Sequence, residues 1–374
     1  MPILPSLTTF RMPAEWEPHD ATWLAWPHYE RDWPGKFEPI PWVYAEIIRY
    51  LSRAERVDLI VNGAVGEKQA RKTLERANAF NENIRFHRWP TNRVWMRDSG
   101  CTFVIAVRPS ASKLSSRAKP TDLLSSSHQL AAVTWKFNAW AKYSNYQRDE
   151  KIGASMARST EAREVRPTFR KQPVVLEGGS IDSNGQGTLL TTEECLLSKT
   201  QQRNAAMRRA DYEKLFSQHL GVQKVIWLGS GIAGDDTHGH VDDITRFVAP
   251  DTVVTAVETN PNDANYEPLR DNIRRLREAS DQEDKPISII ELPMPAPVFF
   301  EGRRLPASYA NFYIANGLVL VPVFNDPNDR VALDILADLF PDREVVGIYS
   351  GDLIWGFGAM HCMTQQQPRI ALSS

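Results

Sequence analysis

The densest group of chemically reactive side chains lies at residues 234–243, which read GDDTHGHVDD and hold four aspartates and two histidines. Apolar runs flank this stretch at 225–228 and 244–248, and both predict buried strands. Holding so many acids and imidazoles between core strands costs free energy. A functional site accounts for that cost.

Three interpretations fit this stretch. Aspartate and glycine form turns, so the segment is compatible with a solvated turn. A His-x-His pair with aspartates nearby also suits zinc or iron. In the third interpretation, His240 and Asp242 alternate on one strand face and point into one pocket. There the imidazole acts as acid and base while the carboxylate holds a cation.

Cysteine supplies a second kind of reactive group. Cys101 and Cys195 lie in apolar runs and are predicted to be small buried hydrophobes. Cys362 ends a glycine-bearing apolar segment, where it is predicted to face a pocket and act as a nucleophile beside a histidine and carboxylates. A free thiol has a pKa near ~8.5, so attack at neutral pH needs a neighbouring cation or base.

The elements around these residues predict an α/β fold in which the order strand, strand, helix, strand recurs about five times. Predicted strands lie at 20–27, 57–61, 102–107, 130–137, 174–182, 187–192, 225–228, 240–248, 252–257, 287–292, 309–315, 318–324 and 345–349. Predicted helices lie at 43–56, 66–80 and 204–219 and around 269–276 and 332–339. The segment 353–364 is predicted to pair with the opening strand of the first unit.

The polar candidates fall at matching places in these units. Glu177 follows Asp98 by 79 residues, His240 follows Glu177 by 63, and Cys362 follows His240 by 122, about two further repeats. A closed ring of five units would aim each leading strand at one axis and bring these residues together. We therefore predict one catalytic domain over residues 1–374. Two ordinary α/β domains remain the alternative.

Composition narrows the classes of function. The 374 residues are 42% hydrophobic and 24% charged, with a net charge of -2, so no basic field points to nucleic acid. No apolar run approaches the ~20 residues that span a membrane. The N-terminus lacks the features of a signal peptide, and three cysteines favour a reducing compartment, so we expect a cytoplasmic protein. Residues 108–128 are predicted to form an exposed loop or insertion.

The charge of the candidate site indicates its ligand. Asp98, Glu177 and Asp242 would place three carboxylates beside a thiolate, a set that repels itself without a cation. A guanidinium is planar, always charged and pairs bidentately with carboxylates. One such pair at ~4 Å and an effective dielectric of ~20 contributes about 4 kcal/mol. The same charge favours the thiolate, which predicts substrate-assisted activation of Cys362.

Several motifs together resemble one known family. They are MPAEW at 12–16, WMRD at 95–98, LEGG at 176–179, TEEC at 192–195, the stretch 234–243, PASYANFY at 306–313 and HCMTQQ at 361–366. From about residue 12 to 368, the sequence resembles the agmatine deiminases, including the bacterial peptidylarginine-deiminase-like members of the guanidine-modifying superfamily.

This resemblance implies a five-bladed α/β propeller, or pentein, with pseudo-five-fold symmetry, a central active site and neither metal nor cofactor. It implies that Cys362 attacks the guanidinium carbon and forms an amidino-thioether. His240 would then protonate the departing ammonia and activate water.

The resemblance also implies the binding roles. Asp98 and Asp242 would bind the guanidinium nitrogens, Glu177 would hold the substrate and orient His240, and Trp95 would flank the substrate. Two residues depart from the family pattern. Cys101 replaces a proline, which should affect only strand geometry. Phe357 replaces a glycine, which could narrow the pocket or displace Cys362.

The far end of the substrate distinguishes the candidates. Agmatine ends in an amine, which needs an acid, and Asp235 and Asp236 could supply it, although turn formation explains that pair equally well. We therefore predict deimination of agmatine to N-carbamoylputrescine and ammonia, with peptidylarginine or free arginine as the alternative. A homo-oligomer is compatible with the sequence.

Two readings come from other classes of protein. One is a metallohydrolase built on His238, His240, Asp235 and Asp236, which would lose its activity to chelators. The other is a silent binding protein, which would retain guanidinium without releasing ammonia.

Overall fold

Five sheets of three or four strands carry most of the chain in the computed structural model, which describes residues 9–107 and 129–370. The predicted loop or insertion at 108–128 lies outside the described residues. The alternation of these sheets with helices confirms the predicted fold class, α/β.

The strands of each sheet come from one continuous part of the chain, apart from two strands contributed by its ends. One sheet has the order β21-β2-β3-β4, with β21 Gln365–Pro368, β2 His19–Ala25, β3 Arg56–Ile60 and β4 Ile84–His87. The next has the order β1-β5-β6-β7, with β1 Thr9–Arg11, β5 Thr102–Val107, β6 Gln129–Val133 and β7 Arg163–Val165.

The other three sheets have three strands each. They are β10 Asp182–Ser183, β11 Thr188–Thr192 and β12 Lys224–Leu228; β13 Thr245–Ala249, β14 Thr252–Val257 and β15 Ser288–Pro293; and β18 Tyr313–Ala315, β19 Leu318–Val323 and β20 Glu344–Tyr349. Two small ribbons are formed by β8 Thr168–Phe169 with β9 Gln172–Pro173 and by β16 Phe299–Phe300 with β17 Arg303–Arg304.

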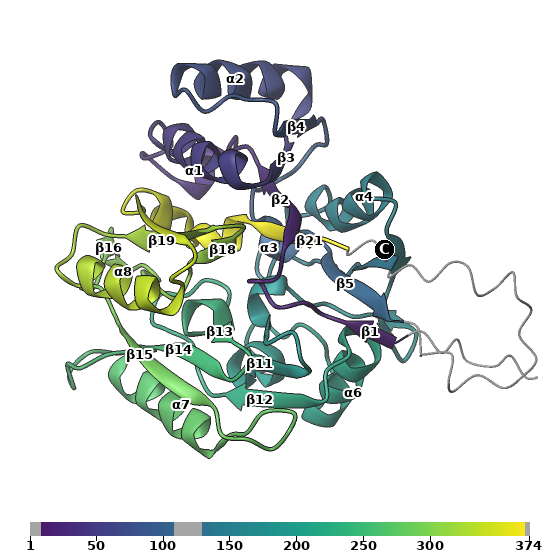
Figure 1. Ribbon diagram of the computed structural model, residues 1–374, viewed down its shortest axis with the longest axis vertical. Coiled ribbons are helices and arrows are strands. Elements are labelled where there is room, and N and C mark those ends of the chain that lie inside the picture. Colours follow the sequence, from purple (N-terminus) through teal and green to yellow (C-terminus); the bar gives the residue numbers. More distant parts are fainter. Residues whose placement is uncertain (1–8, 108–128, 371–374) are drawn as a thin grey trace, which may run out of the picture.

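The helices connect these strands. They are α1 Ile40–Ala54, α2 Gly63–Arg76, α3 Met96–Ser99, α4 Ile152–Ser159, α5 Glu193–Leu197, α6 Arg209–Leu220, α7 Tyr266–Glu278, α8 Asn328–Leu339 and α9 Met360–Met363. Figure 1 shows α1, α2, α4, α6, α7 and α8 around the outside of the molecule, whereas α3 lies near its middle.

The same pairing pattern recurs in the five sheets. An antiparallel pair comes first, as in β10 with β11, β13 with β14 and β18 with β19. A helix then leads to a strand that pairs in parallel, as in β12, β15 and β20. The predicted order of strand, strand, helix, strand is therefore present.

Local chemistry explains several of the element boundaries. Gly221 ends α6 in the left-handed region, with φ of 75°, a conformation that glycine adopts without a steric penalty. Helix α1 turns Tyr44, Ile47, Ile48 and Leu51 toward the core at helical spacing, and all four are fully buried.

Three predicted elements differ near the functional residues. The strand expected at 240–248 begins only at Thr245, because Val241–Asp243 forms a 3-10 turn. The strand expected at 174–182 is interrupted by another 3-10 turn, Gly178–Ser180. The segment 353–364 is no strand; β21, which follows it, pairs with β2. Aspartate and glycine pack poorly in strands, so these stretches satisfy their backbones in tight turns.

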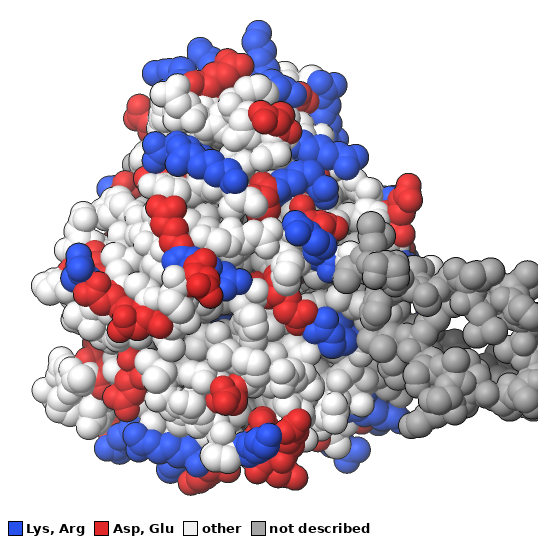
Figure 2. Space-filling view, viewed as in Figure 1, with Lys and Arg blue, Asp and Glu red and all other residues white. Residues whose placement is uncertain are grey.

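The surface and the helices limit the interactions of the described residues. Figure 2 shows basic and acidic side chains interspersed over the visible face, without a field of one sign. Among the helices of the described residues, none is both long and apolar enough to cross a membrane.

Candidate active site

Short helical turns, each followed by a strand, position the predicted site residues. Asp98 lies in α3 before β5, Asp242 in the turn Val241–Asp243 before β13, and Cys362 in α9 before β21. Glu177 and His240 each directly precede a 3-10 turn. The prediction that His240 and Asp242 alternate along a strand, and that Cys362 ends one, is therefore wrong. Their side chains nevertheless converge.

Gly179 marks the point of convergence. A methyl group on this residue would lie 2.6 Å from His240 Nδ1, 2.9 Å from Asp242 Oδ2 and 3.0 Å from Asp98 Oδ1. Real Cβ atoms essentially never approach other atoms so closely. The glycine therefore creates the space that the three side chains share.

Asp98 is held by two donors. Trp140 Nε1 donates to its Oδ2 at 2.8 Å, and the backbone N–H of Gly179 donates to its Oδ1 at 3.1 Å. Burial raises the pKa of Asp98 to about 6, with Asp242 and Glu177 adding to the rise and His240 opposing it. Asp98 is thus a carboxyl group whose charge depends on a nearby cation.

His240 lies within reach of three carboxylates but bonds to none of them. Its Nδ1 is 3.9 Å from Asp98 Oδ2 and 4.0 Å from Asp242 Oδ1, and its Nε2 is 3.8 Å from Glu177 Oε2. Burial lowers the pKa of this imidazole, but Asp98, Cys195 and Glu177 together raise it by more, and the net result is well above the usual value. The protonated form of His240 is therefore favoured by its carboxylate neighbours.

Glu177 has a buried partner that the sequence analysis missed. Arg203 Nε donates to both carboxylate oxygens, at 3.0 and 3.3 Å, and both side chains are fully buried. Burial raises the pKa of Glu177, but Arg203 and His240 lower it below its usual value. Arg203 also donates to the carbonyl oxygens of Thr237 and Gln201. This arginine fixes Glu177 as a carboxylate.

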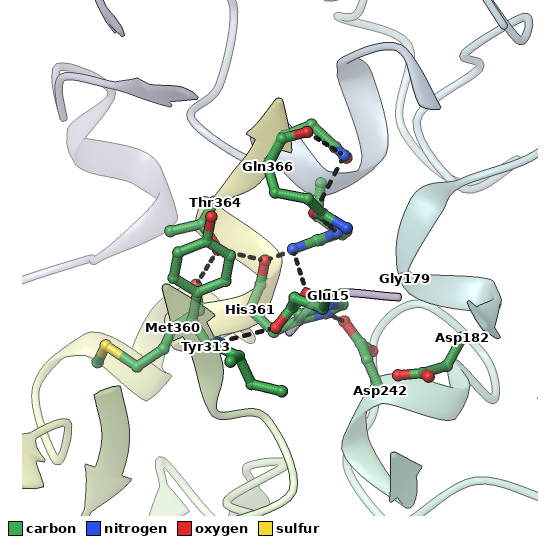
Figure 3. Close-up of polar contacts among 12 residues, drawn as sticks. Glu15, Gly179, Asp182, Asp242, Tyr313, Met360, His361, Thr364 and Gln366 are labelled. Atoms are coloured by element: carbon green, nitrogen blue, oxygen red, sulfur yellow. Dashed lines mark hydrogen bonds and ion pairs between the residues drawn. The ribbon is translucent and has the colours of Figure 1, made fainter. Parts of the chain in front are cut away.

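A second missed group is centred on His361, whose ring lies between Asp242 and Glu15 (Figure 3). His361 bonds through Nδ1 to Asp242 Oδ2 at 2.7 Å and through Nε2 to Glu15 Oε2 at 2.9 Å. Asn311 Oδ1 accepts from the backbone N–H of His361 at 3.0 Å, and Asn311 Nδ2 lies 3.1 Å from Cys362 Sγ. His361 and Asn311 thus hold both Asp242 and Cys362.

Cys362 is a buried thiol among acids. Its Sγ donates to Asp242 Oδ2 at 3.7 Å. Burial raises the pKa of Cys362, and Asp242, Asp243 and Asp98 raise it further, to well above its usual value. The protonated thiol is therefore favoured, and an entering cation would favour the thiolate.

The count of charges made from the sequence needs correction. Asp98, Glu177 and Asp242 do lie together, but Arg203 compensates Glu177 and His361 lies against Asp242. Asp98 is the member of this set without a cationic side chain in contact, apart from His240 at 3.9 Å. The site still has room for one more positive charge.

An open pocket of about 780 Å³ leads to Cys362. Of the predicted residues, Trp95, Asp98, Asp236 and Cys362 line it, whereas His240, Glu177 and Asp242 are buried behind it. Phe357 also lines the pocket, with a left-handed φ of 66°, and the Arg303 guanidinium lies 4.1 Å from the centre of its ring. Phe357 is therefore one of the residues that line the pocket.

Asp235 and Asp236 occupy different environments. Asp235 does not line the pocket; its oxygens accept from the backbone N–H groups of Thr237, Gly239 and His240 at 2.6 to 3.1 Å. This favours the turn-forming role for Asp235. Asp236 lines the pocket, where its carboxylate accepts from three side chains: Lys142 at 2.5 Å, Tyr143 at 2.5 Å and Arg303 at 2.6 Å.

Two buried groups of side chains bear on the alternative of a metal site. Within residues 9–107 and 129–370, two buried sets bring their atoms within 4.8 Å: Glu177 with Cys195 and His240, and Asp242 with Asp243 and Cys362. His238 is in neither set, because its ring faces Ser198 and Glu194. The arrangement of His238 with His240 proposed for a metallohydrolase is therefore absent from these residues.

Comparison with known proteins places this site in a family. The family model of the Porphyromonas-type peptidyl-arginine deiminases matches residues 11–368. The chain belongs to this family. The family resemblance predicted from the motifs is thereby confirmed.

Relatives within and around this deiminase family align over nearly the whole chain. The agmatine deiminase of Pseudomonas aeruginosa is 34% identical over 387 residues, covering 97% of each chain. The solved agmatine deiminase of Enterococcus faecalis has a TM-score of 0.84 and 29% identity, covering 99% of this chain and 100% of its own. A substrate-bound agmatine deiminase variant from C. jejuni has a TM-score of 0.82 and 25% identity, covering 99% of each chain.

Some missed residues of this deiminase had a signal in the sequence. Glu15, Asn311 and His361 lie inside the motifs that carried the family resemblance. Arg203 had no such signal, because it lies in the connection between α5 and α6 and reaches Glu177 only in the folded chain.

Proposed function

We propose that this protein hydrolyses agmatine to N-carbamoylputrescine and ammonia. The observation that carries the proposal is a set of buried polar atoms at the point of convergence that have no hydrogen-bond partner among the described residues: both ring nitrogens of His240 and Oδ1 of Asp242. Unsatisfied buried polar atoms are costly, so such a set is typical of a site that a polar ligand completes. Agmatine deiminases among the relatives supply the substrate class.

In the proposed complex the guanidinium enters beside Trp95. Its N–H groups donate to Asp98 and to the free Oδ1 of Asp242, while Glu177 holds the substrate and orients His240. The cation lowers the pKa of Cys362, whose thiol proton is lost to the water of the pocket as the substrate binds. The thiolate is then formed only when there is a carbon for it to attack.

Two steps complete the proposed reaction. The Cys362 sulfur attacks the guanidinium carbon, and His240 transfers its proton to the departing nitrogen, so that ammonia leaves and an amidino-thioether remains. His240 then takes a proton from water. The resulting hydroxide attacks the same carbon, the C–S bond breaks, and the hydroxyl group of the adduct loses its proton to solvent, which releases the ureido product and the thiolate. No step requires a metal or cofactor.

A peptidylarginine or free arginine substrate is the second candidate. The pocket of about 780 Å³ is much larger than agmatine needs. Arg303, with half of its side chain exposed, and Lys142 surround Asp236 and offer donors for a carboxylate or a peptide carbonyl. We assign Asp236 to the ammonium of agmatine, which would replace one of these two cations.

The architecture of the proposed enzyme follows from the recurring sheets. We propose that the five sheets are the blades of an α/β propeller with pseudo-five-fold symmetry, and that residues 1–374 form one catalytic domain. The turns that carry Asp98, Asp242 and Cys362 lead into three different sheets, through β5, β13 and β21, which supports this arrangement. All three cysteines are unpaired, which supports a reducing compartment such as the cytoplasm.

Ammonia release tests the function directly. The assay compares agmatine, arginine and an arginine-containing peptide with wild type and Cys362→Ala. We expect wild type to prefer agmatine and the variant to release no ammonia while keeping its fold by circular dichroism. Preference for arginine or the peptide would favour the second candidate.

The same assay separates the other classes of function. A chelator should leave the rate unchanged, whereas a metallohydrolase would lose activity. Equal activity in Cys362→Ala would refute the nucleophile. A protein that binds agmatine without releasing ammonia would be a silent binding protein.

A further inference from the structure

The His361 ring lies between two carboxylates, with one at each nitrogen. An ionised carboxylate can only accept hydrogen bonds, so each ring nitrogen must donate, and the ring carries both protons. We propose that this buried imidazolium is a positioning residue, which pairs with Asp242 Oδ2 and leaves Oδ1 aimed at the substrate guanidinium. The inference rests on the proposed function, which assigns Asp242 to that guanidinium.

The charges around His361 balance only when the ring is charged. Glu15 Oε2 accepts hydrogen bonds from His361 and Arg97, and Glu15 Oε1 accepts one from Arg246 at 2.9 Å. Arg246 also pairs with Asp182. The buried network therefore contains three carboxylates and three cations: Glu15, Asp182 and Asp242 with Arg97, Arg246 and His361. A neutral His361 would leave one buried carboxylate uncompensated.

The geometry joins this network to the reacting atoms. The exposed fraction of the His361 side chain is 3%, so water cannot replace either bond. Asp242 Oδ2 is fixed at 2.7 Å, while its Oδ1 has no partner and lies 4.0 Å from His240 Nδ1. His361 directly precedes Cys362 in the same short helix. A change at the imidazole would therefore alter the surroundings of both the Asp242 carboxylate and the Cys362 thiol.

The other charged groups near Asp242 show why His361 matters. The groups that face it are Asp98, Asp243, Cys362, His240, Arg246 and His361. Burial raises the pKa of Asp242, and His361 contributes the largest opposing effect, so that the net pKa is below the usual value. Without the imidazolium, the pKa of Asp242 rises, and the ionised form that binds guanidinium appears only at higher pH.

The test is the pH profile of kcat/KM for agmatine in wild type and His361→Gln, since glutamine keeps a polar side chain of similar length but carries no charge. We expect the acid limb to move to higher pH by about one unit. On the acid side this corresponds to a loss of kcat/KM of about tenfold. The loss should shrink toward alkaline pH and affect KM more than kcat.

His87→Gln is the matched control. His87 Nε2 lies 2.6 Å from Asp58 Oδ1, and both residues are buried in the sheet of β3 and β4, away from the residues that line the pocket. This variant also loses a buried histidine–carboxylate pair. Its pH profile should match that of wild type, even if its thermal stability falls.

A uniform drop of the His361→Gln profile at every pH would overturn the inference, because it would reveal a packing role alone. If His361→Gln does not fold, Glu15→Gln takes its place. Losing the Glu15 charge destabilises the same imidazolium, so the acid limb should move in the same direction. An acid limb that does not move would contradict the inference. Wild-type turnover decides the proposed function separately; the shape of the variant profile decides this inference.

Discussion

Cys362 depends on its neighbours for reactivity. The thiol is buried, and Asp242, Asp243 and Asp98 raise its pKa further. Because the thiolate is the reactive form, a thiol with a raised pKa reacts slowly with oxidants and alkylating reagents. The same acids that suppress the thiolate are those that would bind the substrate, so binding and activation are coupled through one set of charges.

Alkylation by iodoacetamide, a neutral reagent, measures this suppression. We expect Asp242→Asn to alkylate faster than wild type at neutral pH, because it removes the carboxylate that raises the pKa of Cys362 most after burial. Asp236→Asn removes a carboxylate from the same pocket, but one that does not act on the thiol, and should react at the wild-type rate. Mass spectrometry would assign the modified cysteine. Equal rates for the two variants would contradict the electrostatic explanation.

The residues that could be predicted from sequence are those whose types carry chemistry on their own. Residue type and spacing predict Asp98, Glu177, His240, Asp242 and Cys362, and their side chains converge. Their partner Arg203 could not be named from pattern, because it acts through a contact between distant segments. The charge balance of a buried site depends on such contacts.

At the scale of elements, the site residues lie in or next to short helical turns, whereas the sequence predicted that strands carry them. A strand would place alternate residues on opposite faces, whereas a helical turn directs a side chain inward just before its strand begins. Periodicity identified the strands and helices that bury apolar faces, but it could not identify turns of three or four residues. The side chains of Asp98, His240 and Asp242, which these turns carry or adjoin, pack closely around Gly179.

Gly179→Ala tests that packing. Its methyl group would collide with His240 Nδ1, Asp242 Oδ2 and Asp98 Oδ1, so we expect a loss of kcat/KM of about a hundredfold or more, of the order caused by misplaced catalytic groups. Gly66→Ala is the control. Its methyl group would make ordinary contacts of 3.7 to 3.9 Å in α2, and it should keep full activity with unchanged or slightly higher stability. Wild-type activity in Gly179→Ala would show that the three side chains need not converge there.

Across the whole molecule, the candidate site is assembled from turns that lead into four different sheets. Asp98 precedes β5, Glu177 precedes β10, His240 and Asp242 precede β13, and Cys362 precedes β21. The recurring order of elements predicted this assembly even though the sequence repeat is faint, because each unit faces the same packing problem. The positions of the sheets around the site could not be derived from one unit alone.

The most direct measurement of the central claim is to trap the covalent intermediate. Wild-type protein is mixed with agmatine, quenched rapidly with acid and digested for mass spectrometry. The account predicts that the peptide containing Cys362 is heavier by agmatine less one ammonia, and that Cys101 and Cys195 are unmodified. An adduct on Cys101 or Cys195, or turnover of agmatine with Cys362 unmodified at every quench time, would contradict it.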